Sequence, residues 1–267
     1  MSLFNFNQEE MLTFFAVLVR YGVLVAVLPF LGDRFIPAPA KVLLALAMTI
    51  ALFPALVAAG DVKPGEALVW GATAGGIIGT ICLEALFGLV LGYTAKLLFD
   101  GIMFGSHLTG TFMGFASASI YDPHQESQTQ VVAEVQLALA MLIFLAIDGH
   151  HMMLRASLDS YRIVGLGKVT FGAAFGQRLL EMTGQVFRFA IQLSAPISIA
   201  LFGVNVAFGV LAKAIPQVNI LVLSFAVTTL IGLFVMLISL PEFQSVVAGI
   251  LGRMEEWLEA MKVALHG

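Results

Sequence analysis

The sequence predicts an all-α integral-membrane protein built from six or seven long apolar helices and helical hairpins. Hydrophobic residues make up 60% of its 267 residues and charged residues only 11%. Soluble domains usually carry about a quarter charged residues, so this chain has too little polar surface to cover a water-soluble core. Its apolar runs also reach or exceed the roughly 20 residues that one membrane crossing needs.

The charge and cysteine content exclude several classes of function. The net charge of −4 comes without a basic block, so we do not expect nucleic acid as a partner. The lone Cys82 rules out an internal disulfide and a four-cysteine metal site. Because Cys82 lies within an apolar run, we expect a small core residue here, in preference to a reactive thiol.

The first half of the chain divides into apolar segments separated by proline- and glycine-containing turns. The first segment spans 11–31 and ends before Pro37 and Pro39, and the second spans 42–59. The N-terminus lacks the basic region of a cleavable signal peptide, so we expect the first segment to be retained. The stretch 67–118 is too long for one simple crossing and predicts two helices or one bent helix.

The second half begins with a polar segment, 122–130, and an apolar run, 131–147. Residues 152–176 are mixed in character. Two apolar helices, 187–212 and 218–240, are joined by a short polar turn and therefore predict a hairpin.

Glycines recur at every fourth position along the long apolar stretch, and positions four apart share one face of a helix. A face without side chains lets another backbone approach closely. Packing within this chain and packing against other subunits explain the pattern equally well. The glycines predicted to serve this packing are Gly71, Gly75, Gly79, Gly88, Gly92, Gly101 and Gly105.

The segment from His107 to Asp122 mixes small residues with large apolar ones. Small residues make the backbone easy to deform, and aromatic and methionine side chains can seal a narrow space. One interpretation is a movable pore plug, and an ordinary helix end with a loop is the alternative that composition alone favours. The candidate plug residues are Phe112, Met113, Phe115 and Tyr121.

Several ionisable residues interrupt the apolar runs, and such residues usually face a partner or water because lipid solvates them poorly. We expect structural pairing between helices or subunits in preference to a proton relay, and Lys96 and Asp100 have the spacing of a pair on one helix face. The residues concerned are Arg20, Glu84, Lys96, Asp100, Glu134 and Arg188.

No pattern predicts an enzyme, a cofactor or a metal site. A nucleotide-binding loop and the common zinc and serine-hydrolase motifs are absent from the sequence. Asp148, His150 and His151 are metal-ligand types, but adjacent histidines point to different sides of a helix and no fourth ligand follows at a known spacing. We expect capping and polar contacts there.

The tail from Glu242 to Leu265 carries apolar residues at three- and four-residue spacing, which predicts an amphipathic helix. Its other side is acidic, with Glu255, Glu256 and Glu259. Anionic headgroups attract basic residues, so we expect docking on a partner protein more than binding to the membrane surface.

Several short motifs, in this order, resemble the FliR/SctT family of type III secretion export-gate proteins over nearly the whole chain. They are Arg20 with Pro29-Phe30 and Ile36-Pro37, Glu84-x3-Gly88-x3-Gly92, Gly114-Phe115 with Asp122-Pro123, Gly149-His150-His151 with Ser160-Tyr161, and Ala195-Pro196 with Asn205 and Pro216-Gln217-Val218-Asn219. The sequence departs from the family pattern at Arg162–Gly165, where a proline is common, and at Lys213, where arginine is common.

The resemblance implies a FliP-like part (1–167) with a central plug loop (about 107–123), a FliQ-like hairpin (168–241) and a C-terminal helix (242–267). It implies a hetero-oligomer with FliP-like, FliQ-like and FlhB-like subunits within the flagellar basal body of the bacterial inner membrane. Such a gate builds and closes the channel through which unfolded flagellar proteins are exported. A stand-alone small-molecule transporter is the alternative, with Glu84, Lys96 and Asp100 as its possible site.

Overall fold

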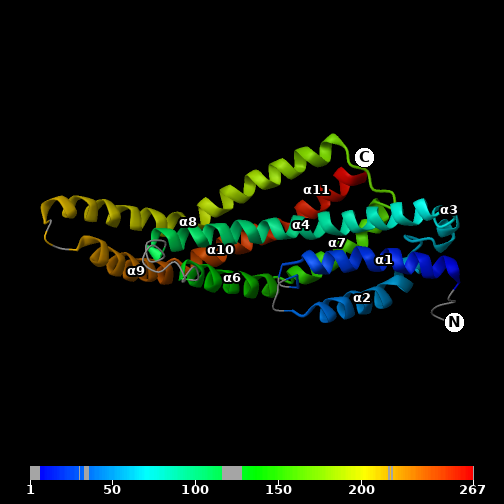
Figure 1. The fold of residues 1–267 in the computed structure, drawn as a ribbon, viewed down its shortest axis with the longest axis horizontal. Coiled ribbons are helices and arrows are strands. Elements are labelled where there is room, and N and C mark those ends of the chain that lie inside the picture. Colours follow the sequence, from blue (N-terminus) through cyan, green and yellow to red (C-terminus); the bar gives the residue numbers. More distant parts are fainter. Residues whose placement is uncertain are drawn as a thin grey trace. The chain divides into compact units, whose positions relative to one another are not determined.

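The computed structural model describes residues 7–29, 31–32, 36–115, 128–215, 217 and 219–266, with the backbone alone for 128–130 and 221. Every regular element in this part of the chain is a helix, which confirms the all-α prediction (Figure 1). The elements are α1 (Gln8–Val27), α2 (Ala38–Ala59), η1 (Pro64–Glu66), α3 (Ala67–Trp70), α4 (Ala74–Phe112), α6 (Gln128–Ala146), α7 (Gly149–Ile163), α8 (Ala173–Ala214), α9 (Ile220–Ile238), α10 (Leu240–Gly252) and α11 (Met254–His266).

Among the described residues, α1, α2, α4 and α8 are each long and apolar enough to cross a membrane. Two bent groups of helices could each form one further span, which would raise the number of candidate spans to six. The first group is α6 with α7, and the second is α9 with α10 and α11. The chain is therefore an integral-membrane helical protein, as predicted. Helices α4 and α8 have 39 and 42 residues, about twice the length that one crossing requires.

Helix boundaries follow the turn residues for identifiable physical reasons. Pro37 precedes α2 and Pro39 lies in its first turn, where a missing N–H costs no hydrogen bond. Gly60 ends α2 with a φ of 77°, a conformation that side chains disfavour. Asn219 caps α9, its side chain accepting a hydrogen bond from the backbone N–H of Val222 at 3.5 Å.

Three elements take a form that the sequence left open or did not predict. The 67–118 stretch follows η1, begins with the short α3 and continues as one helix, α4, in which no proline occurs. The mixed segment after residue 147 forms α7, which buries Met153 and Tyr161 together with Ser157 and Ser160, while its arginines at 155 and 162 are exposed. The C-terminal stripe is two helices, α10 and α11, separated at Arg253.

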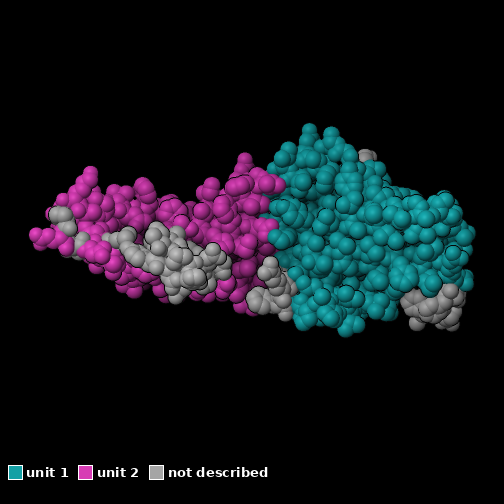
Figure 2. All heavy atoms as spheres, in the orientation of Figure 1, with its two compact units in different colours: residues 1–97, 149–182, 253–267 teal, residues 98–148, 183–252 magenta. Residues whose placement is uncertain are grey.

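The chain forms two compact units, coloured separately in Figure 2. Unit 1 comprises residues 1–97, 149–182 and 253–267, and unit 2 comprises 98–148 and 183–252. Both units draw on segments that are distant in sequence. The predicted linear division at residues 167 and 241 rests on likeness to other subunits and stays a prediction.

Unit 1 is organised around α1. This helix packs on α2, η1 and α3, and α7 packs on α2 and α11. Val17, Tyr21 and Leu24 of α1 are buried, together with Phe87 and Leu91 of α4. The buried face of α1 is thus covered by elements that follow it in sequence, and Tyr161 of α7 also reaches it, its ring 6.5 Å from that of Tyr21.

Unit 2 contains the α8–α9 hairpin from residue 183 onward, which was predicted from the polar turn between its two apolar helices (Figure 1). Two residues of that turn, Pro216 and Val218, lie outside the described residues. The core of the unit joins α8, α6 and the end of α4, and α10 packs on α6 and α9. The buried cluster consists of Met113, Val132, Ile197 and Leu201, with Phe115, Ile231, Val235 and Met236 packed against it.

The apolar stripe of the tail is already covered by this chain. Trp257, Leu258 and Met261 of α11 are buried in unit 1, where α11 packs on α7. The backbone N–H of Thr170 donates a hydrogen bond to the carbonyl oxygen of Leu265 at 2.9 Å. The stripe is therefore not an open docking face, and the partner-docking prediction for 242–267 now concerns only the exposed side with Glu255 and Glu256.

Candidate functional site

Arg20 and Glu84 form a fully buried ion pair in unit 1. The Arg20 Nε donates to Glu84 Oε2 at 2.6 Å, and Nη2 donates to Oε1 at 3.0 Å. Both side chains have no exposed surface. Two parallel hydrogen bonds fix both the distance and the orientation of the pair, so it joins α1 to α4 in one geometry.

The remaining polar groups of this pair are also satisfied. Arg20 Nη1 donates to Ser160 Oγ of α7 at 2.8 Å, and the Gly167 N–H donates to Glu84 Oε1 at 2.7 Å. The guanidinium lies between two rings, 4.3 Å from the centroid of Phe87 and 3.7 Å from that of Tyr161. Buried charges are tolerated where hydrogen bonds and aromatic faces replace water, so this pair is a structural hub for α1, α4 and α7.

The face of α4 that carries Glu84 is also the face that touches the α1 backbone. A Cβ on Gly88 would lie 2.5 Å from the carbonyl oxygen of Arg20, and one on Gly92 would lie 3.0 Å from Val27 Cβ. The Glu84-x3-Gly88-x3-Gly92 motif therefore combines an ion pair with two close backbone approaches. Within unit 1, this part of the glycine pattern serves packing inside the chain.

The other predicted packing glycines fall into three groups. Gly101 and Gly105 pack in unit 2, where added Cβ atoms would lie 3.4 Å from Phe189 Cβ and 2.8 Å from the Ala190 carbonyl oxygen. Gly71 lies outside α4, and its Cβ would collide with the Ala67 carbonyl oxygen. Gly75 and Gly79 have, among the described residues and apart from their neighbours and their own helix backbone, no atom within 4 Å of an added Cβ.

The open face with Gly75 and Gly79 continues through Cys82 and Leu86, both exposed. The expectation of a core position for Cys82 is wrong. Two residues along a helix turn the side chain about 200°, so Cys82 faces away from the side on which Glu84 is buried.

The other predicted membrane charges are not brought into the hub. Lys96 and Asp100 are half-buried, and each has a partner in the structure, while their expected pairing with each other stays a prediction. Arg188 on α8 and Glu134 on α6 are exposed.

The candidate plug residues have different environments. Met113 is completely buried, Phe115 is partly buried, and Phe112 at the end of α4 is exposed. The Phe115 ring meets the Phe225 ring edge-on, with centroids 6.1 Å apart. Tyr121 lies outside the described residues, as does all of the predicted plug loop after Phe115.

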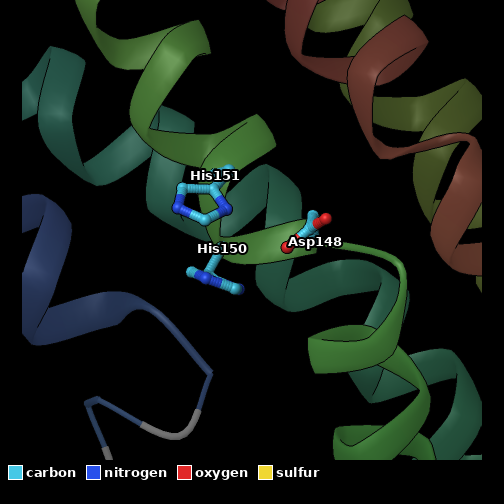
Figure 3. Close-up of side chains that lie close together, drawn as sticks. All are labelled: Asp148, His150 and His151. Atoms are coloured by element: carbon cyan, nitrogen blue, oxygen red, sulfur yellow. The ribbon is translucent and has the colours of Figure 1, made fainter.

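Asp148, His150 and His151 lie at the start of α7 (Figure 3). Asp148 has a φ of 56°, and one potential ligand atom from each residue lies within 4.8 Å of the others. The two imidazole rings have centroids 4.1 Å apart. Asp148 and His151 also have further partners, which fits the polar contacts expected at this helix end.

A family model described as "Bacterial export proteins, family 1" matches residues 11–254. The chain belongs to this family. Three similar relatives carry the name "Flagellar biosynthetic protein FliR". The Escherichia coli K12 protein is 26% identical over 228 residues, covering 85% of this chain and 84% of the relative. The Pectobacterium carotovorum protein is 29% identical over 241 residues, covering 89% of each.

The third relative, from Buchnera aphidicola subspecies Baizongia pistaciae, is 25% identical over 260 residues, covering 96% of this chain and 98% of the relative. The family match includes every residue of the buried hub, from Arg20 on α1 to Gly167 after α7. The resemblance inferred from short motifs is confirmed.

Sequence reasoning identified Arg20 and Glu84 separately but did not pair them. It also missed Phe87 and Gly167, which complete the hub. An aromatic residue three positions after Glu84 was the available signal for Phe87, because residues three apart lie side by side on a helix. For Gly167, no local signal distinguished it from any other loop glycine.

Proposed function

We propose that this chain is a subunit of the flagellar type III protein-export gate, in the bacterial inner membrane within the flagellar basal body. It helps to build and close the channel through which unfolded flagellar proteins leave the cell. The observation that carries this function is the family match over 11–254, with relatives named for flagellar biosynthesis that align over most of both chains.

The chain works through packing and closure and catalyses no reaction. Its best-formed cluster of charged and polar groups, Arg20 with Glu84 and Ser160, is sealed from solvent and satisfied internally, so it offers no open position for a substrate. Energy for export comes from other components of the apparatus and from the proton-motive force.

The stand-alone transporter loses its support. Glu84, its central candidate residue, is fully engaged by Arg20 and by the Gly167 N–H. Membership of an export-protein family also favours a component of a larger apparatus.

The partners are FliP-like and FliQ-like membrane subunits and an FlhB-like subunit, with exported unfolded proteins as transient substrates. The open glycine face of α4, Gly75 and Gly79, supports close packing of a neighbouring helix. Large apolar side chains exposed along the α8–α9 hairpin support a second contact, because they lie outside the core of unit 2 and its own residues leave them uncovered. They include Ile199, Phe202, Leu230, Phe234 and Leu237.

Closure depends on the end of α4, where Phe112, Met113 and Phe115 are plug residues together with Tyr121. The buried Met113 and half-buried Phe115 anchor this region in unit 2, and the exposed Phe112 is available to the channel.

The test is deletion of the gene from a flagellated host and complementation with this chain carrying an affinity tag. We expect restored secretion of flagellar proteins into the medium and co-purification of small membrane subunits with the tagged chain. Uptake of small molecules should be unchanged. A chain that purifies alone, and that restores solute uptake without restoring secretion, would be a transporter.

A further inference from the structure

The backbone carbonyl of Met113 is held by two threonines of α9 in unit 2. Thr229 Oγ1 and Thr228 Oγ1 each donate to this oxygen at 3.2 Å. A carbonyl at the end of a helix has no partner within that helix, and an apolar core offers no water to replace it. The hydroxyl of Thr228 can instead donate to the Ser224 carbonyl oxygen of its own helix, at 2.8 Å. We therefore expect Thr229 to be the main donor to the Met113 carbonyl oxygen.

The side chain of Met113 fits a notch in the same helix. Met113 has no exposed surface, and a Cβ on Gly232 would lie 2.6 Å from its Cγ. Next to it, Gly114 turns the chain with a φ of 91°, and the Phe115 ring reaches Phe225. The contacted α9 positions, 225, 228, 229 and 232, follow the three- and four-residue spacing of one helical face.

We propose that Thr228, Thr229 and Gly232 form a latch that positions Met113, and that the gate opens when this latch is released. The inference rests on the proposed function and adds positioning residues to it. These contacts can break and re-form at low cost in free energy, because they are neutral hydrogen bonds and the packing of a flexible methionine side chain against a glycine. Separating the buried ion pair of unit 1 would cost much more, because it would leave a buried charge without a partner.

The first test removes the hydroxyls and keeps the shape, with Thr229→Val alone and combined with Thr228→Val in the complete gate. Loss of a neutral hydrogen bond shifts a two-state population about fivefold. We therefore expect the proton leak of cells carrying the assembled gate to rise about fivefold for Thr229→Val and further for the double variant. The matched control is Thr94→Val, which removes a buried hydroxyl that bonds its own helix through the Val90 carbonyl oxygen at 2.8 Å.

The second test locks the latch. A Cβ on Gly232 would lie 2.6 Å from Met113 Cγ, which is one C–C bond from Met113 Cβ. In a Cys82→Ala background, Met113→Cys and Gly232→Cys therefore bring two Cβ atoms within the reach of a disulfide. Oxidation should block secretion, and a reductant should restore it. The control pair is Gly101→Cys with Phe189→Cys, where the two Cβ positions are 3.4 Å apart within the same unit; its oxidation should leave secretion unchanged.

The outcomes separate the latch from the proposed function. If the wild-type chain neither assembles with membrane subunits nor supports secretion, the proposed function fails. If the wild-type chain does both, two results would overturn the latch. One is a proton leak in cells with the Thr229→Val and double-valine variants that equals the leak with Thr94→Val. The other is secretion that persists after the cysteines introduced at positions 113 and 232 have formed a disulfide. Should the valine variants fail to assemble, the disulfide experiment decides alone.

Discussion

Arg20 on α1 and Glu84 on α4, 64 residues apart in sequence, form a bidentate ion pair with no exposed surface. Removing one partner leaves the other charge buried and uncompensated, which typically costs about 3–5 kcal/mol. We expect Arg20→Ala and Glu84→Ala each to lower the yield and the thermal unfolding midpoint of the detergent-purified chain.

Two comparisons make this prediction specific. Arg20→Met with Glu84→Leu should lose less stability than either single variant, because no unpaired charge is left behind. Arg188→Ala removes an exposed arginine and should be nearly neutral. Equal unfolding midpoints for Arg20→Ala and Arg188→Ala would contradict the structural role of the hub.

Gly88 is the position where a single methyl group should disturb the contact between α1 and α4. Its Cβ would lie 2.5 Å from the Arg20 carbonyl oxygen, which belongs to the backbone and cannot swing away. Overpacking of this kind costs about 1–3 kcal/mol. Gly79→Ala is the matched control, since it has open space and removes a flexible glycine from a helix. In thermal unfolding followed by circular dichroism, we expect the midpoint of Gly88→Ala to lie well below that of wild type. The midpoint of Gly79→Ala should equal or exceed that of wild type.

Gly75 and Gly79 should matter for assembly without affecting the fold. Replacing both by leucine fills the open face, so we expect normal folding but reduced co-purification of membrane subunits. Gly249→Leu on α10, which also has open space and lies outside both proposed partner contacts, tests whether any added bulk has this effect. Cys82 provides an independent probe: a thiol reagent should label it in the isolated chain more than in the assembled gate. Equal labelling in both states would place the partner elsewhere.

Gly167 should resist substitution because of its backbone conformation. Its φ is 70°, and a Cβ would lie 3.2 Å from Thr80 Cγ2. The left-handed conformation costs most residues about 1–2 kcal/mol, while asparagine tolerates it better. We expect Gly167→Ala to lower the unfolding midpoint more than Gly167→Asn. The reverse order would show that loss of space, and not φ, governs this turn.

The tail should divide into a structural face and a free face. Trp257 is 4% exposed, and truncating a buried tryptophan typically costs about 3–5 kcal/mol. Trp257→Ala should therefore destabilise the isolated chain. Glu255→Gln with Glu256→Gln should leave its unfolding unchanged and weaken co-purification if the acidic side docks on a partner. Destabilisation by the glutamine pair would assign these carboxylates to the fold instead.

Local sequence patterns were sufficient for the positions and types of most elements. Pro37, Gly60 and Asn219 set helix ends through their own backbone or side-chain chemistry, and these effects act within a few residues. Helix α7 was missed because its mean hydropathy is low, so its sequence does not stand out as an apolar segment. Which of its residues are buried depends on packing against α2 and α11.

The pairing of charges could not be predicted in the same way. Glu84 has no lysine or arginine within four residues on its own helix, so its partner had to come from another helix, and helical periodicity says nothing about which helix lies opposite. The structure shows that Arg20 is the partner. Because Gly88 has no side chain, the α1 backbone lies close enough to α4 for Arg20 to form two hydrogen bonds with Glu84.

The sequence by itself determined the all-helical membrane character of this protein and its family, since composition, apolar run length and motif order are properties of the chain. Tertiary structure alone decided the use of each face: Gly88 and Gly92 inside the chain, Gly75 and Gly79 open, and Met113 in the notch of α9. The physical reason is that a helical stripe specifies a surface to be covered, while the element that covers it depends on contacts between residues far apart in sequence.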